Sequence, residues 1–171
     1  METPNWFLDF EGFTHDNKFW VKEICILPFG QPGDKDFDED LSYNYFVKTD
    51  MREFPEYSAS TYNWQFRRHR LSPWFGDYHF DEAMRDIQIK VGKGKVFVKG
   101  LQKALFISQY LSVVELPEGL CNFKQASGFY DKCCKVKHSR EFCAIRKAHV
   151  LRNAYNRDDE ICNKTIWLKT I

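Results

Sequence analysis

Two carboxylates within an apolar stretch near the N-terminus constrain this chain more than any other feature. The stretch from Trp6 to Phe13 reads WFLDFEGF, with Asp9 and Glu11 two positions apart. Because successive side chains of a strand alternate between its faces, both acids are expected on one face. A buried carboxylate needs a cation, a hydrogen-bond donor or a metal beside it, and two together suit magnesium or manganese. The alternative is an edge strand with two solvated acids.

The rest of the chain predicts a single α/β domain over residues 1–171. Strands are expected at 6–13, 19–27, 43–48, 95–98 and 112–116, and helices at 56–70, 80–91, 101–111 and 139–155. The order is therefore β-β-β-α-α-β-α-β-α. Short turns join the first strands in antiparallel pairs, whereas a strand-helix-strand unit requires a parallel pair. We expect one mixed sheet flanked by helices.

Charge and cysteine content limit the classes of partner. The chain has 25 basic and 24 acidic residues, so a nucleic-acid site must be a local patch. The N-terminus lacks the basic and apolar segments of a secretory signal, and no run is long enough to span a membrane. We therefore expect an intracellular protein, cytoplasmic or nuclear, whose six cysteines are thiols or metal ligands.

Local basic clusters with aromatic neighbours are the candidate nucleic-acid contacts. The basic residues are Arg67, Arg68, Arg70, Lys99 and Lys103. Trp64, Phe66 and Trp74 accompany the arginines. Cationic side chains contact phosphates, and aromatic faces stack unpaired bases. The pattern favours single-stranded RNA, or DNA, as partner. The alternative is that a charge-balanced chain forms such clusters by chance and that its aromatic residues pack in the core.

A group of cysteines and one histidine predicts a structural zinc site. The candidate ligands are Cys121, Cys133, Cys134, His138 and Cys143. Zinc prefers four thiolate or imidazole ligands, so five candidates leave the ligand set open. Two alternatives are buried structural thiols and a cysteine nucleophile with His138 or His149 as its base.

The element order, together with Asp9 and Glu11, resembles the ribonuclease H-like superfamily, in particular the DEDD exonucleases. Residues 8–12, LDFEG, resemble the first exonuclease motif, whose acids bind two metal ions. Residues 96–111 look like the strand-to-helix turn of the second motif, and residues 113–116 resemble the following strand. The resemblance covers roughly residues 5–155 and implies the mixed sheet described above.

The chain departs from that family where two further acids are required. The helix of the second motif carries no aspartate here, and Lys103 would bring an ammonium near the family's metal position. In the third motif, His138 is followed at the family's spacing by Cys143 in place of aspartate. Two-metal hydrolysis needs several carboxylates. The resemblance therefore implies a degenerate active site.

The cysteine and histidine group is similar to that of the Maelstrom domain, a member of the superfamily that lost its catalytic acids. That domain holds zinc with one glutamate, two cysteines and one histidine. Cys134, His138 and Cys143 resemble its Cys-His-Cys portion, and Glu23 is a candidate for the glutamate.

These observations predict a nucleic-acid-binding or nucleic-acid-processing domain with incomplete catalytic acids and a structural zinc. One alternative is an active nuclease that uses Asp9 and Glu11 with magnesium or manganese. Its third acid would be Glu115, Asp158 or Asp159. The other alternative is a protein-interaction module on the same fold, for which the sequence identifies no partner.

Overall fold

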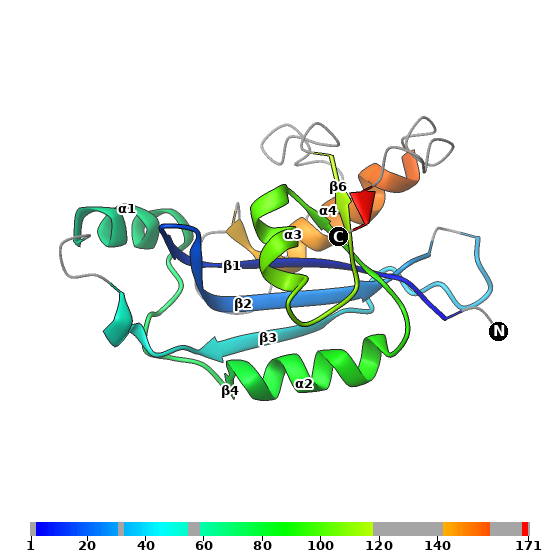
Figure 1. Ribbon diagram of the computed structural model, residues 1–171. Coiled ribbons are helices and arrows are strands. Elements are labelled where there is room, and N and C mark those ends of the chain that lie inside the picture. Colours follow the sequence, from blue (N-terminus) through cyan, green and yellow to red (C-terminus); the bar gives the residue numbers. More distant parts are fainter. Residues whose placement is uncertain (1–2, 31–32, 55–58, 118–141, 158–168, 171) are drawn as a thin grey trace.

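The computed structural model describes residues 3–30, 33–54, 59–117, 142–157 and 169–170, which form an α/β fold around a mixed sheet (Figure 1). Its strands are β1 (Trp6–His15), β2 (Lys18–Pro28), β3 (Tyr43–Lys48), β4 (Tyr78–His79), β5 (Val96–Lys99), β6 (Val113–Leu116) and β7 (Lys169–Thr170). They lie in the order β4-β3-β2-β1-β5-β6-β7. The pairs β1–β2, β2–β3 and β6–β7 are antiparallel, and the pairs β1–β5, β5–β6 and β3–β4 are parallel. The expected mixed sheet is confirmed.

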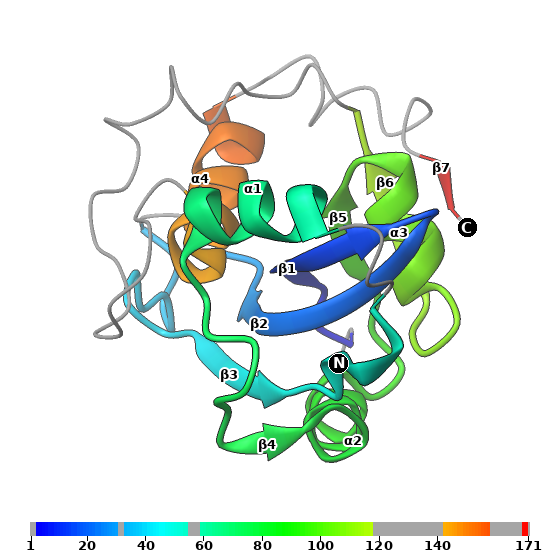
Figure 2. The ribbon, with the colours of Figure 1, turned by 90° about the vertical axis from the view of Figure 1, so that its left-hand side faces the viewer.

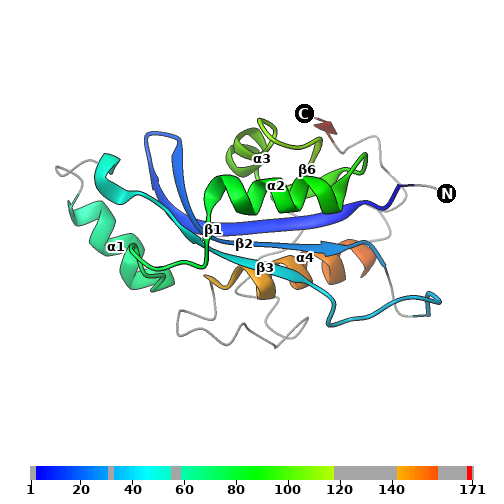
Figure 3. The same cartoon turned by 90° about the horizontal axis from the view of Figure 1, so that it is seen from below.

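Helices cover both faces of this sheet (Figure 3). They are α1 (Ala59–His69), α2 (Phe80–Val91), α3 (Leu101–Ile107) and α4 (Ala144–Arg157), with a short 3₁₀ turn at Met51–Glu53. On one face, α2 and α3 pack against Leu8, Phe10 and other buried residues of the sheet. On the other face, α4 packs against Phe7, Phe97 and their neighbours.

The central strand β1 is buried on both faces, which explains its nearly continuous apolar sequence. Its pairing with β2 shifts between Glu11 and Gly12, where a β-bulge leaves Lys22 unmatched. A Cβ at Gly12 would lie 2.1 Å from the Trp20 carbonyl oxygen, so only glycine allows this close approach of the two backbones. The bulge thus separates the part of β1 that carries Asp9 and Glu11 from its last four residues, Gly12 to His15.

A smaller aromatic core attaches α1 to the end of the hairpin. Phe13 stacks on Tyr62 of α1 with ring centroids 4.8 Å apart. The Gln65 side chain adds two hydrogen bonds: its Oε1 accepts from Thr14 N–H at 2.6 Å, and its Nε2 donates to the Thr14 carbonyl at 2.7 Å. These contacts hold α1 across the end of the β1–β2 hairpin (Figure 2).

Several element bounds differ from those expected. The helix expected at 101–111 ends at Ile107, because the Ser108 hydroxyl donates to the Leu105 carbonyl and the chain continues in tight turns. The helix expected at 139–155 runs from Ala144 to Arg157, and its first expected residues lie outside the described ones. Strands β4 and β7 were not expected, because strands of two residues show no periodicity.

Within the described part of the chain, every helix is too short or too polar to cross a bilayer.

Candidate functional site

Asp9 and Glu11 lie on the face of β1 that α4 covers. Phe7 packs beneath α4, and the alternation of the strand gives Asp9 and Glu11 the same orientation as Phe7. Asp9 is only 1% exposed. The expected alternation is therefore confirmed, and the alternative of two solvated acids on an edge strand is wrong because β1 lies between β2 and β5.

Two lysines from different helices bind this pair of acids. Lys103 of α3 donates from Nζ to Asp9 Oδ1 at 2.9 Å and to the Phe10 carbonyl at 2.6 Å, and it lies 3.5 Å from Glu11 Oε1. Lys147 of α4 donates to Glu11 Oε1, and its Nζ lies 3.7 Å from Asp9 Oδ2. Two ammonium groups and two carboxylates thus form one network that joins β1, α3 and α4.

In this network the neighbouring opposite charges shift the pKa of Glu11 and of Lys147, and both shifts favour the charged form. Burial alone would raise the pKa of Glu11, but the nearby Lys103 and Lys147 ammonium groups hold it below its usual value. Burial works against the charge of Lys147 as well, yet Asp9 and Glu11 raise its pKa above that of a free lysine. Glu11 and Lys147 are therefore both ionised at neutral pH.

These residues do not fit a two-metal centre. Such a centre needs several carboxylates with open coordination positions, whereas here Lys103 binds Asp9 Oδ1 and Lys147 binds Glu11 Oε1, with Lys147 Nζ also 3.7 Å from Asp9 Oδ2. Among the described residues, no three His, Cys, Asp or Glu side chains come together in an arrangement that could hold a metal ion. The network supplies its own cations from Lys103 and Lys147.

The third proposed acid does not join this network. Glu115 lies in β6 opposite Val98 of β5. Val98 packs on the α2 and α3 side of the sheet, and paired residues of neighbouring strands share a face. Glu115 therefore lies on the face away from Asp9 and Glu11. The other two candidates, Asp158 and Asp159, lie outside the described residues.

Glu23 is a third buried carboxylate on the α4 face, opposite Glu11 in the β1–β2 ladder. Its Oε1 accepts a hydrogen bond from Ala144 N–H at 2.5 Å, at the first residue of α4. A carboxylate at this place satisfies a backbone donor that the helix leaves unpaired and complements the helix dipole. Glu23 therefore fixes where α4 begins, which in turn positions Lys147.

Of the candidate zinc ligands, the structure describes Cys143 and Glu23. Cys143 is buried directly before α4, next to the residue that Glu23 binds. Two of the residues considered for zinc, Glu23 and Cys143, therefore lie side by side. The remaining candidates are outside the described residues; they are Cys121, Cys133, Cys134 and His138.

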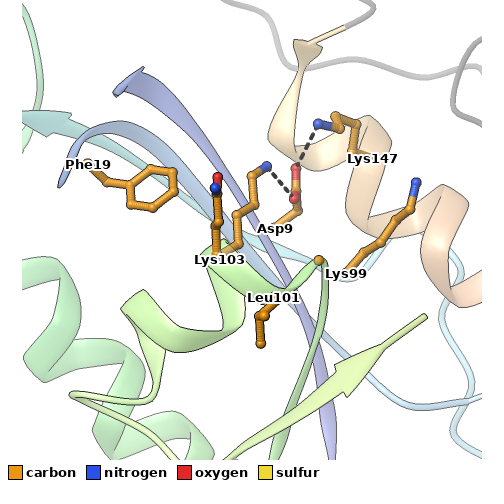
Figure 4. Close-up of a pocket in the computed structure, with 8 residues that line it drawn as sticks. Asp9, Phe19, Lys99, Leu101, Lys103 and Lys147 are labelled. Carbon is orange, nitrogen blue, oxygen red and sulfur yellow. Dashed lines mark hydrogen bonds and ion pairs between the residues drawn. The ribbon is translucent and has the colours of Figure 1, made fainter. Parts of the chain in front are cut away.

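A pocket of about 610 Å³ opens beside the network (Figure 4). Its lining residues are Asp9, Phe19, Lys99, Gly100, Leu101, Gln102, Lys103 and Lys147. Lys99 is the last residue of β5 and Lys103 lies in α3, so the two sequence-predicted lysines do come together. Lys147 was missed, because a lysine on an amphipathic helix carries no local signal until that helix is placed over β1.

The three predicted arginines lie on a separate surface at the end of α1. Arg67, Arg68 and Arg70 are all exposed. The Arg68 guanidinium lies 4.3 Å from the Trp64 ring centroid and 4.7 Å from that of Phe142. Phe142 lies two residues before the start of α4, so this surface continues from α1 toward the helix that carries Lys147.

Exposed aromatic residues lie within a few positions of these arginines in the chain. Trp64 is 57% exposed and Trp74 is 67% exposed, and Phe66 and Phe75 are exposed as well. Residues 59–76 contain three arginines and no acid. We call this set (Trp64, Phe66, Arg67, Arg68, Arg70, Trp74 and Phe75) the arginine–aromatic surface. The alternative that the aromatic residues beside the arginines pack in the core is wrong for Trp64, Phe66 and Trp74, which are exposed.

Compared with known proteins, the chain matches no family model and no curated protein.

Proposed function

We propose that this chain is a ribonuclease H-like domain with a degenerate active site that binds single-stranded nucleic acid, RNA in the first place, without metal-dependent cleavage. The mixed sheet with helices on both faces and the D-x-E pair in the central strand support the proposed fold. Asp9 and Glu11 occupy the positions of the first exonuclease motif. Lysines from α3 and α4, the helices that would carry the missing acids, contact both carboxylates.

The arginine–aromatic surface is the observation that carries the binding proposal. Exposed tryptophan rings offer stacking faces to unpaired bases, and the three arginines offer contacts to the phosphates between those bases. The cation above the Trp64 ring holds one stacking platform in place. Single-stranded binding is favoured over duplex binding because the bases of a duplex are stacked on each other and their faces are covered.

The test is binding of a labelled, unstructured single-stranded RNA, and of the DNA of the same sequence, measured by fluorescence anisotropy in EDTA and in Mg²⁺. We expect salt-dependent binding in both buffers and no cleavage. Trp64→Ala should weaken binding about tenfold, the scale of one lost base stack. Arg68→Ala should lower affinity and reduce the slope of log affinity against log salt by about 0.7, as expected for one lost phosphate contact.

Arg85 provides the matched control. It is an exposed arginine on α2, which covers the face of the sheet opposite to α4 (Figure 3). Arg85→Ala should leave affinity unchanged. Absence of salt-dependent binding to both nucleic acids would refute the proposal and favour a protein-interaction module. Cleavage that requires Mg²⁺ or Mn²⁺ and is lost in Asp9→Asn would instead establish an active nuclease.

A further inference from the structure

We infer that Arg68 makes the arginine–aromatic surface selective for guanine, so that its preferred partner is a single strand with an unpaired guanine. This inference rests on the proposed function and adds to it the base that the surface recognises. It follows from the two aromatic rings that hold one guanidinium, from the open hydrogen-bond donors of that guanidinium, and from the acceptors that each base offers.

Aromatic rings from two distant parts of the chain hold the Arg68 guanidinium in place. Trp64 lies four positions earlier in α1, on the same side of the helix, and its ring centroid is 4.3 Å from the guanidinium carbon. Phe142 lies two residues before α4, and its ring centroid is 4.7 Å from the same atom. An arginine held against two rings loses less conformational freedom on binding a ligand than a freely moving one does.

The hydrogen-bond donors of Arg68 are open to a ligand. Its side chain is exposed, and within the described part of the chain no carboxylate or carbonyl accepts a hydrogen bond from it. Residues 59–76 contain no acid that could neutralise its charge. The five N–H groups of a guanidinium form a rigid planar fork. Arg68 therefore presents a fixed planar set of donors to a flat acceptor that lies beside it.

A base that stacks on Trp64 would lie beside this fork. Trp64 is 57% exposed, and the guanidinium covers part of one face of its ring system. A base on the rest of that face lies at the level of the guanidinium, with one edge toward the N–H groups. The surface thus offers a single unpaired base a stacking platform and a pair of donors together.

Guanine is the base whose edge best fits two parallel donors. Its O6 and N7 are neighbouring acceptors, and the contact of arginine with this pair is the commonest specific contact in protein–DNA complexes. Adenine has an amino donor next to N7, so the same approach would bring donors together. Two N–H groups of Arg68 bind the guanine, and its other N–H groups stay available for a phosphate, as the proposed function requires.

The experiment places one guanine, adenine, cytosine or uracil at the centre of the same short oligouridine. Affinities for the wild-type protein are measured by fluorescence anisotropy with an end label, in EDTA and at one salt concentration. We expect the guanine strand to bind about tenfold more tightly than the adenine strand, the scale of one bidentate base contact. The cytosine and uracil strands should bind no better than the adenine strand.

Arg68→Lys separates base recognition from charge, because lysine keeps the positive charge but lacks the planar fork. In this variant the affinity ratio of the guanine and adenine strands should fall to about two or less, while affinity for the uridine strand changes little. Arg67→Lys is the matched control: the same substitution at the neighbouring exposed arginine of α1 should keep the ratio. A ratio retained in Arg68→Lys, or lost equally in both variants, overturns the assignment to Arg68.

The remaining outcomes separate this inference from the proposed function. If the four strands bind the wild-type protein equally well, or another base is preferred, guanine selectivity is refuted and the proposed function stands. If none of them binds, the proposed function fails and this inference fails with it. Guanosine 5′-monophosphate is added as a competitor to test free nucleotides as the source of the base. If it binds as tightly as the guanine strand, the surface is a site for free nucleotides and the inference about strands is overturned.

Discussion

The Lys103 ammonium lies 2.9 Å from Asp9 Oδ1 and joins α3 to the central strand between residues 94 positions apart in the sequence. Asp9 is almost completely buried, so it needs a permanent cation beside it. Lys103 and Lys147 provide that cation from the chain itself. The stability of this centre should therefore depend on the two lysines and not on a divalent metal.

Lys103→Met should be strongly destabilising. The change leaves the buried Asp9 carboxylate without its hydrogen-bonded cation, and loss of one partner of a buried ion pair costs about 3 kcal/mol or more. The free energy of unfolding in urea measures the loss. Lys90→Met is the control, because the Lys90–Asp86 pair is partly exposed and its loss should cost about 0.5 kcal/mol. Equal losses in both variants would contradict a special role for the buried network.

Restoring acids at the lysine positions should create metal binding. The double variant Lys103→Asp with Lys147→Asp would place four carboxylates around the same centre, and carboxylate oxygens are the ligands that hard divalent cations prefer. We expect its melting temperature to fall without metal, through repulsion among the acids, and to recover by several degrees when Mn²⁺ is added. The wild-type protein should show no Mn²⁺-dependent shift. A wild-type shift that Asp9→Asn removes would show that the ammonium groups do not exclude a metal.

Much of the fold could be predicted from sequence, because the long elements carry their own periodic signals. The helix expected at 80–91 is α2, and Met84, Ile87 and Val91, at helical spacing, lie on its buried face. The apolar run of β1 likewise predicted a strand, but it left open whether that strand lies at the edge or in the middle of the sheet. The short strand β4 could not be found this way, because its two residues are defined only by their pairing with β3.

The candidate site was only partly predictable, because its partners converge from distant elements. The D-x-E pattern identified Asp9 and Glu11 as a pair. Lys103 was predicted to bring an ammonium group near them, because it lies in the helix where the second motif lacks its acid. The pairing of Lys147 with Glu11 depends on where α4 begins, which the buried Glu23 carboxylate determines from another strand. No spacing in the sequence reports such a contact across 136 positions.

Lys22 at the bulge should make stability rise with pH. Its side chain is buried and donates to the Pro73 carbonyl at 3.3 Å, and burial lowers its pKa to about 8. A lysine of the unfolded chain keeps its proton up to a pKa of about 10.4. Between these values the unfolded state binds more protons, so the free energy of unfolding increases with pH.

Urea denaturation between pH 7.5 and 10 measures this effect, and Lys22→Met should remove it. The difference between the two proteins isolates Lys22, because all other titrating groups are common to both. Glu11 and Lys147 should contribute no slope in this range. The stability that ionised Glu11 contributes is lost only as pH falls below the usual pKa of a glutamate. The stability that charged Lys147 contributes is lost only as pH rises above the usual pKa of a lysine. Parallel curves would show that Lys22 reaches water and titrates normally.

The structural zinc stays a prediction, and Cys143 allows a direct test of it. One zinc per chain should be found by mass spectrometry, and a strong chelator should lower the melting temperature, because metal binding contributes to the free energy of folding. Cys143→Ala should lower the melting temperature and remove the response to the chelator.

Cys25→Ala is the control: Cys25 is a buried thiol on the same face, and burial raises its pKa, which keeps it in the neutral form. That variant should lose some stability through the cavity it creates, yet melt earlier still when chelator is added. Wild-type melting that does not change on chelation would mean that Cys143 is a packing residue of the α4 core.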